Sequence, residues 1–132
     1  MEIGMKEEVN NGRYEDKNGD VCWFKNGKYH RVDGPAIEFI DGTKKWYLNG
    51  QRHRIDDPAV EYADGSKEWW LDGKRHREDG PAIEYVIGKK EWWVNGVEQS
   101  EEEFNQWLEK KNLNEKLENS LKKKPSVKKV KI

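Results

Sequence analysis

The sequence is poor in cysteine and in aliphatic residues, and it contains no long apolar run. Its 132 residues include one cysteine and are only 33% hydrophobic. One cysteine forms no internal disulfide, which favours a reducing compartment, so we expect a cytoplasmic protein. No apolar run approaches the roughly 18 residues that span a bilayer, and the start, MEIGMKEEVNNG, lacks the apolar stretch of a signal peptide. The sequence therefore predicts no association with membranes.

Charged and aromatic residues are abundant instead. Charged residues make up 39% of the chain, and low hydrophobicity with high charge is typical of disorder. Seven tryptophans and five tyrosines argue against disorder, because disordered chains are poor in aromatic residues. The net charge of −1 hides an asymmetry: nine Lys and three Glu give +6 from residue 109 onward, so the first 108 residues carry −7. We expect a thin aromatic core, an acidic body and a basic tail.

Several columns of residues recur with a period of 23. The tryptophan, histidine and proline columns are Trp23, Trp46, Trp69 and Trp92; His30, His53 and His76; and Pro35, Pro58 and Pro81. Asn-Gly or Asp-Gly dipeptides recur at 26–27, 49–50, 72–73 and 95–96, and they suit hairpin turns because they accept positive φ. The pattern predicts one strand on AIEF, AVEY and AIEY, and a second on KKWYL, KEWWL and KEWWV.

The stretches DGTKKWYLNGQRH and DGSKEWWLDGKRH resemble the MORN repeat, which has a similar length and a DGxxYxGxWxxGKxHGxG pattern. The resemblance covers residues 14–96, about two thirds of the chain. The chain departs from the family at Arg31, Arg54 and Arg77, which replace a glycine and precede DGPA or DDPA, a variant similar to that of bacterial, phage and large-virus proteins. The resemblance implies a mainly β fold, in which stacked antiparallel hairpins form one elongated, twisted sheet. It also implies interaction or assembly rather than enzymatic activity.

The chain divides into four predicted segments. Residues 1–13 form an N-terminal edge segment, and residues 14–98 form the repeat sheet of about four copies, the first and last partial. Residues 99–122 form a C-terminal helical cap, and residues 123–132 form a basic flexible tail.

The helical cap is predicted from local signals. Ser100 and Glu103 have the spacing of a capping box. Apolar residues follow at helical spacing: Phe104, Trp107, Leu108, Leu113, Leu117 and Leu121. We expect a helix that covers part of the sheet and is either continuous or broken near Asn112.

We expect no catalytic centre, no metal site and no cofactor. Histidines of neighbouring copies lie two strands apart, about 10 Å at roughly 4.8 Å per strand, whereas zinc ligands lie about 2 Å from the ion. The histidines are therefore predicted to be structural, packed on the tryptophans or bonded to a backbone carbonyl. The carboxylates of Asp33, Asp56 and Asp79 recur beside the three arginines and are predicted to form ladder salt bridges. Cys22 occurs in one copy only and is predicted to be a structural thiol.

Paired aromatic residues divide the predicted sheet into two faces, because adjacent residues on a strand point to opposite faces. One face carries the tryptophan column, and we expect Ile37, Val60 and Ile83 to join it. The other face carries a second aromatic column, which consists of Phe24, Tyr47, Trp70 and Trp93. These residues either form an interface or pack on each other and on lysine stems. The candidate partner-binding residues are Tyr47, Trp70, Trp93, Phe24, Glu61 and Glu84.

The leading functional hypothesis is a non-catalytic protein-binding module. Its most specific form is a phage-encoded inhibitor of a host or CRISPR-type defence nuclease, which would act in the host cytoplasm by placing an acidic surface in a basic nucleic-acid channel. The alternative is a nucleic-acid-binding protein that uses sheet aromatics and the lysine tail, although its acidic body would repel phosphate. The lysines concerned are Lys122, Lys123, Lys124, Lys128 and Lys129. Self-association through sheet edges is open under either hypothesis.

Overall fold

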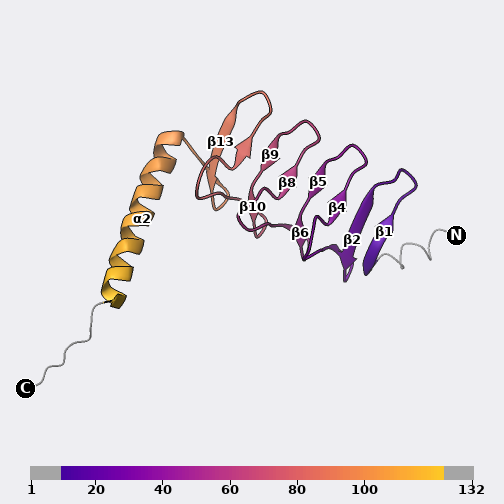
Figure 1. Ribbon diagram of the computed structural model, residues 1–132, viewed down its shortest axis with the longest axis horizontal. Helices are drawn as coiled ribbons and strands as arrows, with labels where there is room; N and C mark the ends of the chain where they lie inside the picture. Colours follow the sequence, from indigo (N-terminus) through magenta and orange to yellow (C-terminus); the bar gives the residue numbers. More distant parts are fainter. Residues whose placement is uncertain (1–9, 124–132) are drawn as a thin grey trace, which may run out of the picture.

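The computed structural model describes residues 10–123 as an array of stacked β-hairpins with one helix, α2 (Glu101–Lys123), at its C-terminal end (Figure 1). Ten strands form an open antiparallel sheet, and four more form two small two-stranded sheets. The main sheet runs in the order β1 (Gly12–Glu15), β2 (Val21–Lys25), β4 (Ile37–Glu38), β5 (Lys44–Lys45), β8 (Val60–Glu61), β9 (Lys67–Glu68), β12 (Ile83–Glu84), β13 (Lys90–Val94) and β14 (Val97–Gln99), and β3 (Lys28–Tyr29) pairs with β2. The small sheets are β6 (Tyr47–Leu48) with β7 (Gln51–Arg52) and β10 (Trp70–Leu71) with β11 (Lys74–Arg75). The predicted mainly β fold of stacked hairpins with a C-terminal helix is confirmed.

The Asn-Gly and Asp-Gly dipeptides form the predicted hairpin turns. Their first residues have φ between 50° and 52°, and their glycines have φ between 78° and 83°. Positive φ at both positions defines a type I′ turn, whose twist matches that of the flanking strands.

In each of the two central copies, the second predicted strand is divided at its first tryptophan. Trp46 separates β5 from β6, and Trp69 separates β9 from β10. The N–H of Trp46 donates to the carbonyl of Ala59 at 2.7 Å, and its own carbonyl accepts from the N–H of His53 at 3.1 Å. The residues before Trp46 therefore pair within the main sheet, and those after it pair within a small hairpin. The prediction of one continuous strand on KKWYL and KEWWL is wrong in this respect.

The strand register places the aliphatic core on the face opposite the tryptophan column. Ile37 and Val60 both lie directly opposite Lys45, and directly opposed residues share a face. Trp46 follows Lys45 and therefore points to the other face. The prediction that Ile37, Val60 and Ile83 join the tryptophan column is thus wrong, because they lie on the face of the second aromatic column. We call this the core face and the opposite one the tryptophan face.

The core is small, as the composition predicts. The buried hydrophobic side chains of the described chain are Ala36, Ile37, Ala59, Val60, Ala82, Ile83, Val94 and Phe104. These residues are mostly small, so the core buries little apolar surface. Contacts between aromatic rings and arginines add to the stability that the core provides.

An arginine closes over each of the first three tryptophans of the column. The guanidinium carbon of Arg54 lies 3.8 Å from the ring centre of Trp46. Its Nη1 donates to the carbonyl of Pro58 at 3.0 Å and to Oε2 of Glu61 at 3.1 Å. We call this group of tryptophan, arginine, proline carbonyl and glutamate a Trp–Arg clamp. The two equivalent clamps contain Trp23, Arg31, Pro35 and Glu38, and Trp69, Arg77, Pro81 and Glu84.

The predicted ladder of arginine–aspartate ion pairs is confirmed in two copies. Asp33 lies 3.0 Å from Nε of Arg31, and Asp79 lies 2.7 Å from Nε of Arg77. In the middle copy the aspartate that pairs with Arg54 is Asp57, at 3.8 Å. The predicted pairing of Arg54 with Asp56 is therefore wrong, because this copy reads DDPA where the others read DGPA.

The histidine column joins each copy to the hairpin turn of the next. Nδ1 of His30 accepts from the N–H of Asn49 at 2.9 Å, and Nδ1 of His53 accepts from the N–H of Asp72 at 3.0 Å. His76 makes the same bond, at 2.9 Å, to the N–H of Asn95. The histidines are structural, as predicted, but their backbone partner is an N–H and not a carbonyl.

Side chains at the other end of the hairpins make a second set of bonds between copies. Oδ1 of Asp20, Oγ1 of Thr43 and Oγ of Ser66 accept from backbone N–H groups 20 residues further on, at 2.9, 3.1 and 3.0 Å. Each hairpin is therefore fixed to the next one at both ends.

The C-terminal helix begins with the predicted capping box and is continuous. Oγ of Ser100 accepts from the N–H of Glu103 at 3.0 Å, and Oε1 of Glu103 accepts from the N–H of Ser100 at 2.8 Å. Of the two alternatives, the continuous helix is the one observed, since α2 has no break near Asn112. Phe104 is the buried residue of the helix, which contacts β13 and β14 and then runs away from the hairpins (Figure 1). The helix thus packs mainly on the last hairpin.

We predict that the Trp–Arg clamp stabilises the fold. The Arg54 side chain is 27% exposed, and its loss leaves Glu61 without its partner and Trp46 uncovered. Arg54→Leu should lower the free energy of unfolding by about 2 kcal/mol, and Arg54→Lys, which keeps the charge but lacks the planar fork, by about 1 kcal/mol. Chemical denaturation followed by tryptophan fluorescence measures both values. Losses below about 0.5 kcal/mol in both variants, as for an ordinary surface ion pair, would contradict this role.

Candidate binding surfaces

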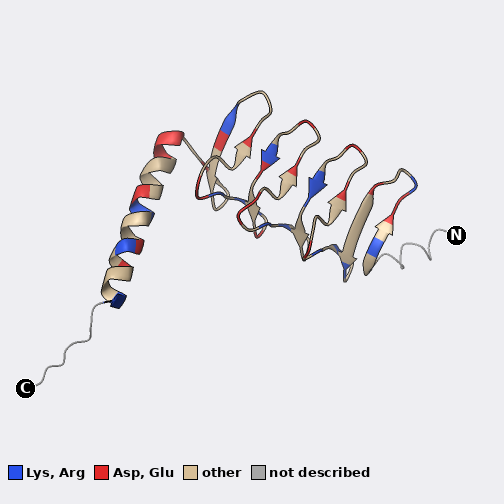
Figure 2. Ribbon diagram, viewed as in Figure 1, with Lys and Arg blue, Asp and Glu red and all other residues tan. Residues whose placement is uncertain are grey.

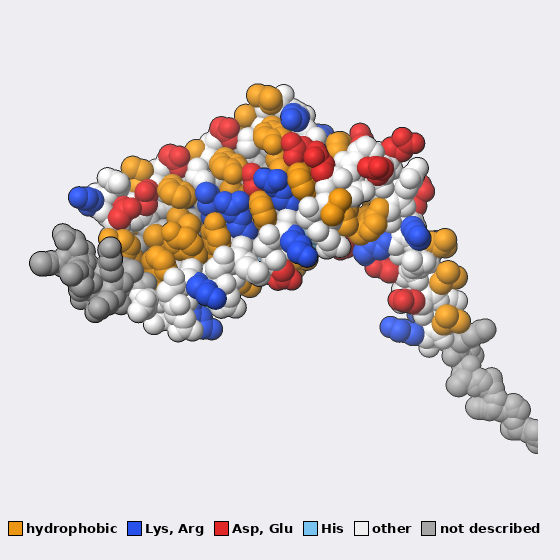
Figure 3. Space-filling model, turned by 180° about the vertical axis from the view of Figure 1, so that it is seen from behind, with side chains coloured by type: hydrophobic (Ala, Val, Ile, Leu, Met, Phe, Trp, Pro, Cys, Tyr) orange, Lys and Arg blue, Asp and Glu red, His pale blue; other side chains and the backbone are white. Residues whose placement is uncertain are grey.

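The second aromatic column is interleaved with arginines. The guanidinium carbon of Arg52 lies 6.0 Å from the ring centre of Tyr47 and 4.9 Å from that of Trp70. The guanidinium carbon of Arg75 lies 5.1 Å from the ring centre of Trp70 and 4.9 Å from that of Trp93. Figure 3 shows hydrophobic and basic side chains side by side over the repeats. Such cation–π contacts hold the rings in place and keep them half-buried.

The polar edges of the column are bonded within the protein. Nε1 of Trp70 donates to Glu68 at 2.7 Å, and Nε1 of Trp93 donates to Glu91 at 3.0 Å. The hydrogen bond from Trp93 is the main cause that lowers the pKa of Glu91 below its usual range. These contacts favour the packing interpretation, with arginines in place of the expected lysine stems. That Tyr47, Trp70 and Trp93 bind a partner stays a prediction.

Phe24 is connected to the column through a tyrosine. The ring centres of Phe24 and Tyr29 lie 5.1 Å apart, and those of Tyr29 and Tyr47 lie 5.3 Å apart. Tyr29 was not predicted, although its position after Lys28 in the first turn places it where later copies have arginine.

Arg75 differs from Arg52 in one polar contact. Nε of Arg52 donates to the hydroxyl of Tyr47 at 3.1 Å. In the next copy Trp70 takes the place of Tyr47 and has no hydroxyl. Among the described residues, Nε of Arg75 is consequently buried without a hydrogen-bond partner.

Glu61 and Glu84, the two predicted partner-binding glutamates, lie on the tryptophan face. Both belong to Trp–Arg clamps, where their side chains are 38% and 36% exposed. The structure therefore does not bring them together with Tyr47, Trp70 and Trp93, which lie on the core face.

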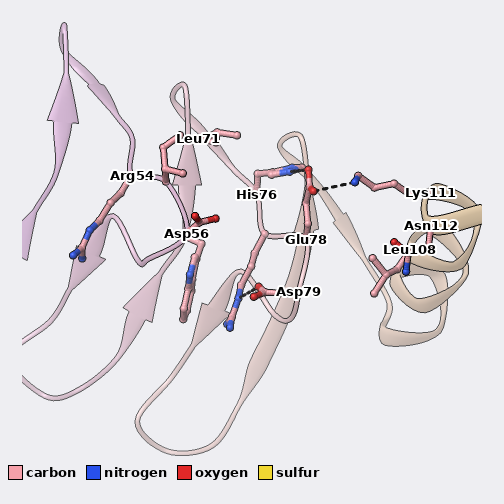
Figure 4. Close-up of a pocket in the computed structure, with 12 residues that line it drawn as sticks. Arg54, Asp56, Leu71, His76, Glu78, Asp79, Leu108, Lys111 and Asn112 are labelled. Atoms are coloured by element: carbon pink, nitrogen blue, oxygen red, sulfur yellow. Dashed lines mark hydrogen bonds and ion pairs between the residues drawn. The ribbon is translucent and has the colours of Figure 1, made fainter. Parts of the chain in front are cut away.

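A groove of about 660 Å³ lies between α2 and the loops that follow the histidines of the second and third copies (Figure 4). Its apolar lining includes Ile55, Leu71 and Leu108. The side chain of Ile55 is 63% exposed. Sequence reasoning did not predict this groove, because it forms between the helix and a repeat rather than within one.

A polar network closes the groove on the side of the helix. Nε2 of the buried His76 lies 2.9 Å from Oε2 of Glu78, and Nζ of Lys111 lies 3.3 Å from Oε1 of Glu78 (Figure 4). Because Nδ1 of His76 accepts from Asn95, we assign the proton to Nε2, which donates to Glu78. The bond from His76 first, and then Lys111, hold the pKa of Glu78 below its usual range. Trp107 packs edge-on against His76, with ring centres 6.3 Å apart.

Asp56 gives the groove a free carboxylate. It has φ of 68°, whereas the other described non-glycine residues with positive φ are the first residues of hairpin turns. Asp57 approaches Arg54 in its place, and no hydrogen bond or ion pair to the side chain of Asp56 occurs within residues 10–123. The sequence signal was the DDPA of the middle copy, which departs from the DGPA of its neighbours.

The exposed charge along these loops is negative. The side chains of Asp33, Asp57 and Asp79 are 82%, 62% and 82% exposed. Those of the arginines in the same loops are only 19–27% exposed, because they lie against tryptophan rings. We call Asp33, Asp56, Asp57 and Asp79 the carboxylate row.

Two of the five predicted nucleic-acid contacts lie at the end of the helix. Lys122 and Lys123 are exposed in its last turn, where the ribbon of Figure 2 is coloured blue for Lys and Arg. Lys124, Lys128 and Lys129 lie outside the described residues, and nucleic-acid binding stays a prediction.

Cys22 is a half-buried thiol opposite Tyr14 and Ile37. Burial first, and then the charges of Asp16 and Asp20, raise the pKa of the Cys22 thiol. A raised pKa disfavours the reactive thiolate, in accord with the predicted structural thiol.

Within residues 10–123, no group of three or more His, Cys, Asp or Glu side chains is arranged to hold a metal ion, and no helix is long and apolar enough to cross a membrane. No protein-family model, curated protein or solved structure matches the chain. The resemblance to the MORN repeat therefore continues to depend on the sequence motifs alone.

We predict that Phe104 anchors α2 to the last hairpin. Its side chain is 3% exposed, whereas Leu117 on the same helix is 55% exposed. Phe104→Ala should lower the free energy of unfolding by about 3 kcal/mol, and the matched control Leu117→Ala should change it by less than about 0.5 kcal/mol. Denaturation followed by circular dichroism measures both values, and equal losses would show that the anchor is elsewhere.

We predict a loss of stability at alkaline pH that depends on Tyr62. Burial first, and then its bond to Glu68 and the charge of Glu68, raise the pKa of Tyr62 to about 12. An unfolded tyrosine loses its proton near pH 10, so the contribution of Tyr62 is present below about pH 10 and is lost as pH rises through about 12. The free energy of unfolding should therefore fall less steeply above about pH 10 in Tyr62→Phe than in the wild type. Equal slopes in the two proteins would contradict this assignment.

Proposed function

We propose that the protein is a non-catalytic module that binds another protein through the carboxylate row and the groove beside α2. The observation that carries this proposal is the contrast in exposure along the row. The side chains of Asp33, Asp57 and Asp79, which form ion pairs, are 62% exposed or more. The neighbouring arginines instead lie against tryptophan rings. A partner that approaches the loops therefore meets negative charge.

The row also offers apolar contacts. Val32 and Ile55 occupy equivalent positions beside the aspartates and are 81% and 63% exposed. Leu71 and Leu108 also line the groove and are half-buried. Apolar contacts with a charged rim are the usual composition of a protein interface.

The chemistry of the row favours a partner with a basic surface. Successive copies are two strands apart, so their carboxylates repeat at about 10 Å along the array. Complementary charges on a partner would steer its approach and fix its register on the repeats. A protein that handles nucleic acid has such a surface, and the inhibitor hypothesis is the more specific form of this proposal.

The test compares two variants that remove the same charge. Asp33→Asn/Asp56→Asn/Asp79→Asn neutralises three of the four carboxylates of the row, and asparagine tolerates the positive φ at position 56. The control, Glu98→Gln/Glu101→Gln/Glu102→Gln, neutralises three exposed residues outside the row and the groove. Both proteins are used as bait in nuclease-treated lysate with crosslinking, and captured proteins are identified by mass spectrometry. We expect a stoichiometric protein that the control retains and the row variant loses, with capture weakened by salt.

Two outcomes would contradict the proposal. Equal capture by both variants, with capture lost in Tyr47→Ala/Trp70→Ala/Trp93→Ala, would move the binding site to the second aromatic column. Recovery of nucleic acid alone from untreated lysate would favour the lysine tail.

A further inference from the structure

Among the residues that the structure describes, the outer edge of β1 is the open N-terminal end of the main sheet. Among the described residues β1 pairs with β2 alone, with Arg13 opposite Trp23 and Tyr14 opposite Cys22. Figure 1 shows β1 at the end of the array opposite to α2. An unpaired edge presents backbone N–H and C=O groups that a further strand can bind.

The described residues before β1 do not cover this edge. The carbonyl of Asn10 accepts from the N–H of Gly27 at 2.8 Å, and Oδ1 of Asn11 accepts from the N–H of Asn26 at 2.9 Å. Both bonds direct this part of the chain to the turn between β2 and β3. The opposite end of the sheet, β14, is contacted by α2.

Backbone hydrogen bonds determine which groups of β1 point outward. The N–H of Asp16 donates to the carbonyl of Asp20 at 3.0 Å, toward β2. Because backbone groups alternate in direction along an antiparallel strand, those of Tyr14 also point toward β2. Those of Arg13 and Glu15 therefore point away from the sheet, into the open edge.

We propose that two copies of the protein pair antiparallel through β1, with Tyr14 on the two-fold axis. Outward-pointing backbone groups of one copy can bond only to outward-pointing backbone groups of the other. Three symmetric registers are therefore centred on Arg13, on Glu15 or midway between them. They place Arg13 opposite Arg13, Glu15 opposite Glu15, or Arg13 opposite Glu15. The first two place like charges in direct opposition, which is destabilising. The third places Arg13 of each copy opposite Glu15 of the other, and Tyr14 opposite Tyr14.

The side chains needed for this register are available. Arg13 and Glu15 are 54% and 53% exposed, and their ion pair within one copy is long, at 3.4 Å. The two-fold axis makes the contact isologous, so it closes after two copies and forms no filament. A strand of four residues buries little surface, so the dimer forms at high concentration.

This inference goes beyond the proposed function and does not depend on it. A dimer through β1 continues the sheet from one copy into the next and doubles the carboxylate row. Two rows in one assembly raise the apparent affinity for a repeated or dimeric partner.

The test is a charge swap read by sedimentation equilibrium of the full chain, from about 10 μM to about 1 mM, a range that brackets weak association. The wild type should dimerise. Arg13→Glu and Glu15→Arg should each weaken the dimer by about tenfold or more, because each places like charges opposite one another at two positions. The double variant Arg13→Glu/Glu15→Arg restores opposite charges and should dimerise like the wild type.

An equimolar mixture of the two single variants provides a second readout. One variant carries only carboxylates at these positions and the other only guanidinium groups, so a mixed dimer should form where neither variant dimerises alone. Circular dichroism and denaturation controls should be unchanged, since all these side chains are about half exposed.

Two results would overturn the proposal. One is a wild type that remains monomeric over the whole range. The other is a double variant that dimerises no better than the single variants.

Discussion

The stacking of an arginine on a tryptophan in each of the first three repeats is the contact on which the rest of the structure depends. Only 33% of the chain is hydrophobic, and its buried aliphatic residues are mainly Ala, Val and Ile. The guanidinium group covers the tryptophan ring, and its N–H groups bond to a proline carbonyl and a glutamate. One side chain thus shields an aromatic surface, satisfies a carbonyl and neutralises a carboxylate, which lets a thin sheet fold with little aliphatic material.

Stacking of the copies depends on bonds at both ends of each hairpin. The histidine Nδ1 atoms and the side chains of Asp20, Thr43 and Ser66 all accept from backbone N–H groups of the next copy. Each copy is therefore stabilised by its contacts with the neighbouring copies, as in other repeat arrays. The array ends at Ser100, which lies 23 residues after Arg77 and caps α2. The helix thus begins at the position where a fourth clamp arginine would stand.

The clamps also determine the character of the surface. Arginines that turn onto tryptophan rings leave the aspartates of the same loops exposed, so the loops present negative charge although both signs occur in their sequence. The middle copy adds Asp56, which faces the groove beside α2 without a partner in the described chain. On the core face the second aromatic column is occupied by Arg52 and Arg75. In our proposal the function therefore uses the side of the repeats that carries the clamps, and not the side of the second aromatic column.

The sequence by itself determined the features that depend on neighbouring residues. Period, hairpin turns and the Ser100 capping box follow from local backbone chemistry, and each was predictable. The tertiary structure alone decided which face receives Ile37 and Val60, because that depends on register between strands of different hairpins. It also decided that Glu61 belongs to a Trp–Arg clamp and that Asp57, and not Asp56, pairs with Arg54. Several carboxylates compete for each arginine, and only the folded geometry selects among them. The groove has the same origin, since its walls come from α2 and from loops of two earlier repeats.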